Sequence, residues 1–290
     1  MEKISNLNFN KEKLIDLHTH TCYSDGELTP DELVDLALKT NVGTLAITDH
    51  DTILGLKNID KENCEKLKIV SGIELSARVE KGQMHILGYG VDKDNVELNN
   101  TLEQLYKKNR DYFISLIQIL QEDYNIKFVT NEIEKLINGM GNLGRPHIAK
   151  LLMKYGYVNS VQEAFDKYLV DIYNKVGYVK GMDYKDCIDL ILKSGGIPVL
   201  AHPKTLKLSS LELINLIKHL VNCGLKGIEV YHSMHSEFEV SQYIQIANEL
   251  NLLVSGGSDF HGYTSKPDIK LGTGKDNLKI KKLSILEKLK

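Results

Sequence analysis

The sequence predicts an α/β fold whose strands form a parallel sheet, either open or closed into a barrel. Short apolar, β-rich runs alternate with helical patterns before about residue 97, and the same alternation returns after about residue 177. The residues between these two blocks are helical, with little strand. A hydrophobic content of 42% with 26% charged residues is typical of a globular protein.

The amino-terminal block begins with a buried strand at residues 13–18, which leads into a helix with a well-defined start. Thr29 can cap the free N–H groups of that helix, Pro30 fits its first turn, and Glu32 completes a capping box. Further strands are predicted at residues 44–50, 68–75 and 84–90.

The carboxyl-terminal block repeats the helix-then-strand pattern, with strands predicted at residues 197–203, 225–232 and 252–262. Residues 97–177 read as helices, and such a block between β–α units is typical of an insertion at a loop, where extra chain is tolerated best. The predicted organisation is a discontinuous barrel domain (residues 11–96 and 178–275), a small helical insertion domain (97–177) and a lysine-rich peripheral tail (276–290).

Composition and charge exclude several classes of function. The net charge is −3, so no global basic field attracts a DNA duplex or an anionic membrane. No apolar stretch reaches the roughly 18 residues needed to span a bilayer, and the first residues lack the apolar segment of a secretory signal. The four cysteines form no CxxC pair. We therefore expect a cytoplasmic protein with reduced thiols.

Histidines and carboxylates fall at or near the ends of the predicted strands. In β/α barrels the carboxyl ends of the strands form the active-site face, and ligands at i and i+2 on an extended segment point the same way. The residues in question are His18, His20, Asp25, His50, Glu74, His85, His202, Asp259 and His261. Imidazoles and carboxylates without thiolates bind divalent ions, and nine ligands exceed the shell of one ion. We expect two or three ions, with manganese as first choice and zinc, iron or magnesium as alternatives.

These residues lie in segments that resemble the PHP family, the polymerase and histidinol phosphatase superfamily. The matching segments are "DLHTHTCYSDG" (16–26), "AITDHDT" (46–52), "GIELSA" (72–77), "HILGYG" (85–90), "LAHP" (200–203) and "GSDFHG" (257–262), in the family's order. The segment "GRPHIA" (144–149) further resembles a group of nucleoside 3′,5′-bisphosphate phosphatases, some of which also remove nucleotides from the 5′ end of short RNA.

The resemblance implies a distorted (β/α)7 barrel of PHP type with a trinuclear metal centre. The implied ligands are His18, His20, Glu74 and Asp259 for the first metal, Glu74, His85 and His202 for the second, and Asp25, His50 and His261 for the third. Every one of these positions carries a competent ligand, which speaks against a catalytically inactive domain.

Four further residues are candidates for binding substrate. Arg145 stands at a predicted helix start, where free N–H groups favour an anion, and its guanidinium can bind phosphate at two points; the alternative is a surface ion pair. For His147 the alternatives are a contact with substrate or a role in packing or helix capping. For Arg78 the alternatives are a position facing the pocket mouth or a position in a solvated loop. In "EVYHSMHS", we favour His235 over His232 as a substrate contact or leaving-group acid.

The expected activity is that of a metal-dependent phosphoesterase that hydrolyses the 3′-phosphate of nucleoside 3′,5′-bisphosphates through a metal-bridged hydroxide. No protein nucleophile is expected, because the chain has no GxSxG or cysteine–histidine signature, and it has no P-loop. The alternatives are a 5′–3′ exoribonuclease on short RNA, a histidinol phosphate phosphatase, and a non-catalytic metal-binding interaction module. The expected partner is a phosphorylated nucleotide or a short RNA.

Overall fold

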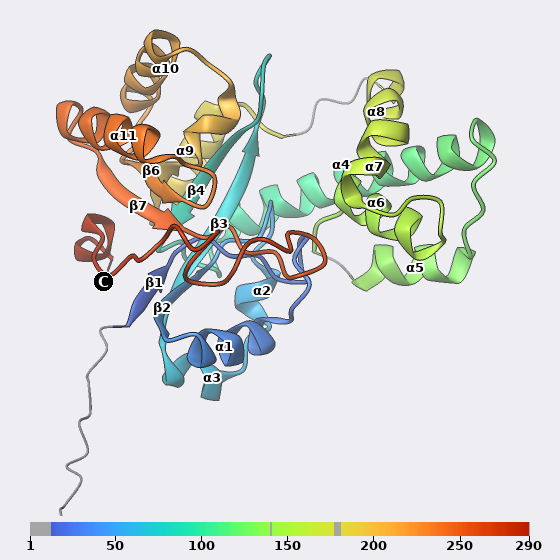
Figure 1. Cartoon of the computed structure of the whole chain (residues 1–290), viewed down its shortest axis with the longest axis horizontal. Coiled ribbons are helices and arrows are strands. Elements are labelled where there is room, and N and C mark those ends of the chain that lie inside the picture. Colours follow the sequence, from blue (N-terminus) through green and yellow to red (C-terminus); the bar gives the residue numbers. More distant parts are fainter. Residues whose placement is uncertain (1–12, 140, 177–180, 290) are drawn as a thin grey trace, which may run out of the picture.

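Seven strands form one sheet in the order in which they occur in the chain (Figure 1). The computed structural model describes residues 13–139, 141–176 and 181–289. The strands are β1 (Leu14–Asp16), β2 (Val42–Ile47), β3 (Lys68–Ala77), β4 (Met84–Tyr89), β5 (Ile197–Leu200), β6 (Gly227–His232) and β7 (Leu253–Gly257). The predicted α/β class is confirmed.

One strand departs from the expected parallel arrangement. β4 pairs antiparallel with both β3 and β5, whereas the other neighbouring strands pair in parallel. Only residues 78–83 separate β3 from β4, which is too short for the crossover that a parallel pair requires. The amino end of β4 therefore lies at the same edge as the carboxyl ends of the parallel strands.

Backbone hydrogen bonds join the two ends of the sheet. Immediately after β1, the amide of Leu17 donates to Gly256 O (3.2 Å) and that of His20 donates to Phe260 O (2.9 Å). In return, the amide of Asp259 donates to His18 O (2.9 Å). The first and last strands thus meet beyond their carboxyl ends, which agrees with the predicted distorted barrel. We call the sheet and the helices that cover it the barrel, after this prediction.

Helices pack around the outside of the sheet. They are α1 (Pro30–Lys39), α2 (Leu54–Lys57), α3 (Lys61–Lys66), α9 (Tyr184–Lys193), α10 (Ser210–Asn222) and α11 (Glu237–Glu249), with the 3₁₀ segments η2 (Pro203–Leu206) and η3 (Ser284–Glu287). The predicted capping box begins α1, since Thr29 Oγ1 accepts from the Glu32 amide (3.3 Å) and the Glu32 carboxylate accepts from the Thr29 amide (2.8 Å). Such a cap contributes about 1 kcal/mol.

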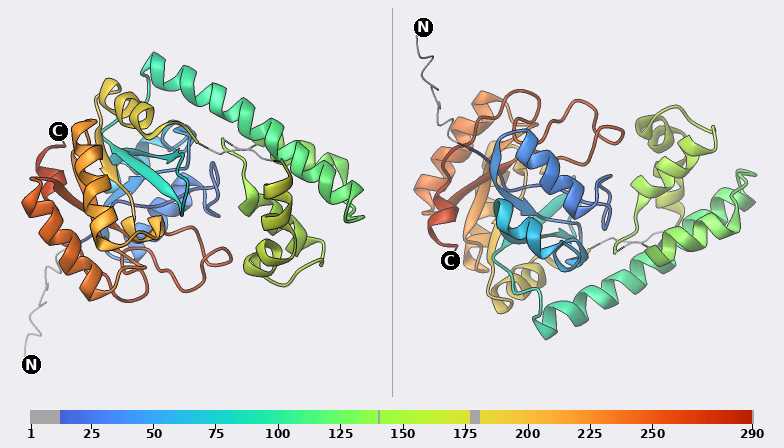
Figure 2. Two further views of the ribbon diagram at one scale, coloured as in Figure 1. Left: turned by 90° about the horizontal axis from the view of Figure 1, so that it is seen from above. Right: turned by 90° about the horizontal axis from the view of Figure 1, so that it is seen from below.

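A second group of helices stands beside the barrel (Figure 2). It comprises α4 (Val96–Glu122), α5 (Thr130–Gly139), α6 (Arg145–Lys154), α7 (Val161–Ala164), the π-helical η1 (Phe165–Leu169) and α8 (Val170–Val176). We call these elements the helical lobe. They enclose a hydrophobic cluster of their own, which includes Phe113, Leu116, Ile148 and Leu152.

The long helix α4 links the lobe to the barrel. Its first turns contribute Leu98, Leu102 and Leu105 to the barrel core, and the rest of the helix runs on into the lobe (Figure 2). A domain boundary at residue 97 would therefore fall inside a continuous helix. The predicted boundaries at residue 11 and between residues 177 and 178 lie outside the described residues.

The carboxyl-terminal segment is not the peripheral tail that its lysines suggested. Leu278, Ile280, Leu283 and Ile285 are buried in a cluster with strand residues such as Ile15. Since apolar residues alternate with the lysines, the segment can bury one set of side chains and expose the other.

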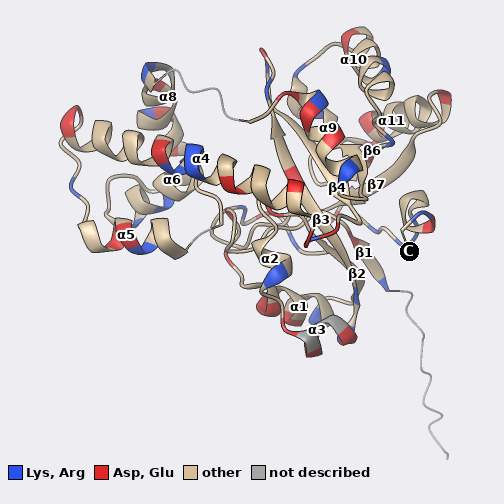
Figure 3. Ribbon diagram, turned by 180° about the vertical axis from the view of Figure 1, so that it is seen from behind, with Lys and Arg blue, Asp and Glu red and all other residues tan. Residues whose placement is uncertain are grey.

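The outer surface carries charges of both signs. Basic and acidic residues lie side by side along α4, α5 and α9 (Figure 3). In the described parts of the chain, no helix is both long enough and apolar enough to cross a membrane.

Candidate metal centre

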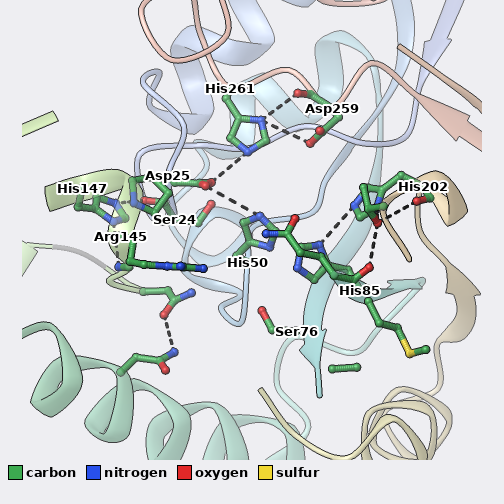
Figure 4. A pocket seen from close by; sticks show the side chains of 18 of the residues that line it. Ser24, Asp25, His50, Ser76, His85, Arg145, His147, His202, Asp259 and His261 are labelled. Carbon is green, nitrogen blue, oxygen red and sulfur yellow. Dashed lines mark hydrogen bonds and ion pairs between the residues drawn. The ribbon is translucent and has the colours of Figure 1, made fainter. Parts of the chain in front are cut away.

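The nine predicted metal ligands meet at one end of the sheet. Figure 4 labels those that also line a cavity, namely Asp25, His50, His85, His202, Asp259 and His261. They follow the carboxyl ends of β1, β2, β5 and β7, lie within β3, or, for His85, lie at the amino end of the antiparallel β4. The i, i+2 spacing works as expected after β1, because Thr19 points away from the rings of His18 and His20 and donates to Ala46 O (2.6 Å). The ligands come from 244 positions of sequence (18–261) but share one face of the barrel.

Glu74 lies at the centre of the cluster and is fully buried. Five imidazole nitrogens surround its carboxylate: His85 Nδ1 and His202 Nε2 at 2.9 Å from Oε1, His50 Nδ1 at 3.1 Å from Oε2, and His18 Nε2 and His20 Nε2 at 3.2 Å from Oε2. The two carboxylate oxygens therefore face two different sets of rings, which is the arrangement a bridging ligand requires.

Two aspartates complete the cluster on either side of Glu74. Asp25 Oδ1 lies 3.2 Å from His261 Nε2, and these two residues form a ligand group with His20 and His50. Asp259 Oδ1 lies 3.3 Å from His20 Nε2. The backbone of Asp259 has a positive φ of 59°, and such strain in a residue other than glycine tends to occur at functional sites.

Several donor atoms of the cluster are buried without a hydrogen-bond partner. They are His18 Nε2, His20 Nε2, His50 Nδ1, Asp25 Oδ1 and Glu74 Oε2. Lone pairs of neutral imidazoles and ionised carboxylates repel one another when they converge, so such an arrangement needs protons or a cation between them. Nitrogen and oxygen donors in this number fit divalent cations of the kind predicted.

Hydrogen bonds on the far side of the rings determine which nitrogen faces the cluster. His18 Nδ1 donates to Glu229 Oε1 (2.9 Å), His261 Nδ1 donates to Asp259 O (2.8 Å), and His202 Nδ1 donates to Thr205 Oγ1 (3.0 Å). In the neutral form of each ring, these bonds place the proton on Nδ1 and leave Nε2 unprotonated toward the centre, as metal ligation requires.

Glu229 is a site residue that the sequence analysis missed. It is fully buried in β6, and its second oxygen accepts the His202 amide (2.7 Å). The available signal was an acidic residue inside the apolar run "GIEVYH", which a buried strand tolerates only when the acid has partners.

The carboxylates and imidazoles of the cluster shift one another's pKa values. Burial alone would raise the pKa of Glu74, but the neighbouring imidazoles, led by His50 and His18, hold it well below its usual range. Burial alone would lower the pKa of His20, but the neighbouring carboxylates of Asp259 and Glu74 raise it to about 9. Without a cation, protons on the imidazoles balance the buried carboxylates.

The sequence matches the family model of the PHP domain over residues 16–191. The chain belongs to the PHP domain family. Its PHP relatives include the 5′-3′ exoribonuclease Rnm of Escherichia coli, which is 35% identical over 253 residues, covering 86% of this chain and 85% of the relative. A 3′,5′-nucleoside bisphosphate phosphatase of Chromobacterium violaceum is 30% identical over 250 residues, covering 85% and 87%.

Two further comparisons extend the range of chemistry. A phosphoribosyl 1,2-cyclic phosphate 1,2-diphosphodiesterase of Eggerthella lenta is 30% identical over 263 residues, covering 85% of this chain and 94% of the relative. The structure of a proposed metal-dependent phosphoesterase from Bifidobacterium adolescentis superposes with a TM-score of 0.80 at 27% identity, covering 96% and 95%. The family and the intact ligand cluster make this PHP domain a phosphoesterase.

A cavity of about 420 Å³ opens from the metal-ligand cluster toward the helical lobe. Arg145, at the first turn of α6, lines it together with the predicted ligands His50 and His202 (Figure 4). Arg78 lines the same cavity. The Arg145 guanidinium lies 4.3 Å from the ring centre of Tyr173. Among the described residues no carboxylate forms an ion pair with Arg145, so the predicted surface ion pair is absent there.

His147 lines the same cavity, but both of its ring nitrogens are already engaged. Nδ1 accepts the Gly144 amide (3.1 Å), and Nε2 donates to Ser24 O (2.5 Å). Burial lowers the pKa of His147, in keeping with a neutral ring that uses one nitrogen as donor and the other as acceptor. Of the two predicted roles, packing and capping fit this geometry better than substrate contact.

The structure places His235 and His232 differently with respect to the ligand cluster, and the preference for His235 stays a prediction that the geometry does not favour. Neither His235 nor His232 is among the residues that line the cavity. His235 Nδ1 donates to Val230 O (2.8 Å), and its ring packs on Tyr243. His232, the last residue of β6, points inward instead, with Nε2 3.5 Å from Asp259 Oδ2. The turn after β6 places His235 away from the cluster, against Val230 and Tyr243, and the spacing of the two histidines in the sequence does not indicate this.

Lys266 is a second site residue that the sequence analysis missed. Its amine lies 2.6 Å from Asp259 Oδ2, and the side chain lines the cavity. It stands in the loop after the "GSDFHG" segment, where no periodicity or motif distinguishes it from the other lysines of the chain.

Proposed function

We propose that this PHP domain hydrolyses the 3′-phosphate of nucleoside 3′,5′-bisphosphates. The observation that carries the proposal is the single cavity that runs from the ligand cluster to Arg145. A substrate with two phosphates can present one to the cluster and the other to the guanidinium. The cavity volume of about 420 Å³ lies in the range of small-molecule sites.

The nine ligands would hold two or three divalent ions, with manganese as first choice. Glu74 would bridge two of them, since its oxygens face separate sets of rings. When bound, the ions would supply Lewis-acid activation of the phosphoryl group and of water. The protein's own side chains then have to bind the substrate, orient it and supply protons.

Arg145 would bind the phosphate that is not cleaved. The faces of Tyr173 and Phe165, with ring centres 4.3 and 5.4 Å from the guanidinium carbon, hold the group without using its N–H donors. Hydrogen bonds between charged groups contribute about 1.5–3 kcal/mol each. A substrate that lacks the second phosphate would lose this contribution.

His232 would hold a proton beside the cluster rather than act as a ligand. The Met234 amide donates to His232 Nδ1 (3.1 Å), so the neutral ring carries its proton on Nε2. Burial lowers the pKa of His232, which favours that neutral form. Its Nε2–H would donate to Asp259 Oδ2 or to an oxygen of the substrate.

A substrate panel tests the proposal. With added Mn²⁺, we expect kcat/KM for adenosine 3′,5′-bisphosphate to exceed that for adenosine 3′-monophosphate, which keeps the cleaved phosphate and lacks the other, by roughly 10–100-fold, which is the value of one charge-assisted contact. Histidinol phosphate and a 1,2-cyclic ribose phosphate belong in the same panel. Comparable turnover of adenosine 3′-monophosphate and the bisphosphate would contradict the two-phosphate substrate, and hydrolysis of no phosphoester would contradict an enzymatic role.

The second candidate function is 5′–3′ exoribonuclease activity on short RNA. It is favoured by the 35% identity to the Escherichia coli exoribonuclease, which covers most of both chains. A short 5′-phosphorylated RNA in the panel separates the two activities, because only the exoribonuclease releases mononucleotides from it. A cytoplasmic location remains a prediction from the sequence.

A further inference from the structure

The loop between β1 and α1 carries one of the proposed metal ligands and lies against the helical lobe. We call residues 21–26 the metal loop, because it includes Asp25 and follows His20 directly. Its inner side is held by the barrel: Asp49 accepts the Thr21 amide (2.7 Å) and the Ser24 hydroxyl (2.7 Å). Its outer side shows four consecutive backbone carbonyls to the lobe.

Every one of those four carbonyls accepts a hydrogen bond from the lobe or from the segment that leads into α6. Tyr23 O accepts from the amides of Gly141 (3.1 Å) and Asn142 (3.0 Å), Ser24 O from His147 Nε2 (2.5 Å), Asp25 O from Lys150 Nζ (2.8 Å), and Gly26 O from Lys150 Nζ (3.4 Å). The donors stand more than a hundred residues away in the sequence, so these contacts depend entirely on the tertiary fold.

Two of the donors are side chains on one face of α6. His147 and Lys150 are three residues apart, which places them side by side on a helix. His147 is only 4% exposed, and Lys150 is half-buried with its amine turned toward the loop rather than toward solvent. Among the described residues neither side chain forms an ion pair within 4 Å, and the nearby carboxylates of Asp25 and Glu27 add a longer-range attraction to the hydrogen bonds of Lys150.

We propose that α6 positions Asp25 for metal binding, with Lys150 and His147 as positioning residues that clamp the metal loop. The helical lobe is then part of the metal centre and not only a wall over the substrate. This inference rests on the proposed role of Asp25 as a metal ligand. Because the clamp holds backbone carbonyls, it acts on the position of the loop and leaves the Asp25 carboxylate free for the ion.

The test compares Lys150→Met with Lys154→Met. Both substitutions remove one amine from the same helix and keep the length of the side chain, but Lys154 pairs with Glu132 (2.8 Å) and does not contact the loop. Lys150→Arg serves as the rescue variant, since it restores a charged donor. Asp25→Asn marks the ion that depends on Asp25.

The first readout is hydrogen exchange in the metal-free protein. The Ser24 and Gly26 amides both donate to Thr21 O, so they report whether the metal loop stays folded. We expect roughly tenfold faster exchange of these amides in Lys150→Met and no change in Lys154→Met. Unchanged exchange in Lys150→Met would overturn the proposal.

The second readout is Mn²⁺ bound per chain, measured by equilibrium dialysis and elemental analysis. Residues that orient ligands typically affect metal affinity by about 10–100-fold. Lys150→Met should therefore weaken the binding of the same Mn²⁺ ion that Asp25→Asn removes, and Lys150→Arg should restore its binding. Wild-type affinity in Lys150→Met, or an equal loss in Lys154→Met, would overturn the clamp. Both readouts are independent of turnover, so failure of the substrate panel leaves this test intact.

Discussion

Replacing Glu74 by Gln should disturb two metal sites at once. The substitution keeps the shape of the side chain but replaces one carboxylate oxygen by an NH₂ group that cannot ligate a cation. The side chain is fully buried, with one oxygen 2.9 Å from His85 and His202 and the other 3.1 Å from His50. Two of the ligand groups around the cavity include Glu74, so both lose their shared anion.

The size of the effect follows from this burial. Removing one partner of a buried charge pair costs about 3–5 kcal/mol, and every 1.4 kcal/mol is a factor of ten in affinity. Mn²⁺ affinity at both groups should therefore fall by roughly 10²- to 10⁴-fold. At Mn²⁺ concentrations a few times above the wild-type dissociation constants, the variant should bind at least two ions fewer than the wild type. If the wild type binds only two ions, with unequal affinities, the variant should bind one ion fewer.

Glu229→Gln provides the matched control for this measurement. It is the same chemical change at an equally buried glutamate, but Glu229 contacts the far nitrogen of His18 and the His202 amide instead of facing a cation. We expect a loss of about 10–100-fold in affinity, without the loss of two ions. Elemental analysis after dialysis measures the stoichiometry, and thermal unfolding confirms that each variant is folded. Unchanged metal content in Glu74→Gln would refute the bridging role.

Three further predictions follow from the geometry of the cavity and the cluster. Arg145→Ala should raise KM for a nucleoside bisphosphate by roughly 10–100-fold and that for a monophosphate much less; equal increases in steady-state assays would contradict the role of the guanidinium. His232→Gln should lower kcat by at least tenfold whereas His235→Gln should leave it nearly unchanged, and the reverse order would contradict the placement of the two rings. In the metal-free protein the pKa of His20 is raised to about 9, so the contribution of His20 to stability is complete below pH 6.5 and is lost as the pH rises through 9. Mn²⁺ binding at pH 7.5 should therefore release protons. Calorimetry in two buffers of different ionisation enthalpy should then give different apparent binding enthalpies.

The convergence of the nine proposed metal ligands could be predicted from sequence because local rules determine where these side chains lie. A residue at the carboxyl end of a barrel strand lies on one face whatever the rest of the chain does, and i, i+2 spacing orients neighbouring side chains alike. His85 lies in the cluster for a different reason, because it stands at the amino end of the antiparallel strand β4. Its place depends on the short link between β3 and β4, which the sequence did show.

The choice between His232 and His235 depended on information that the sequence does not contain. Both follow the same apolar run, and only the course of the turn after β6 decides which ring enters the cluster. The carboxyl-terminal segment was misjudged for a related reason. Its composition is dominated by lysine, but burial depends on which side chains face the barrel, and Ile285 does so.

The clamp on the metal loop corresponds to a feature of the sequence that involves a pair of residues and not a single one. The helix around "RPHIAKLL" buries Ile148, Ala149, Leu151 and Leu152, and yet His147 and Lys150 stand together on one face of it. Interpreted alone, His147 suggested a contact with substrate. Interpreted as a pair at i and i+3, the two side chains indicate a polar partner in the fold, because donors that leave solvent need acceptors. The carbonyls of the metal loop are that partner, and they tie the helical lobe to the ligand that the first barrel loop contributes.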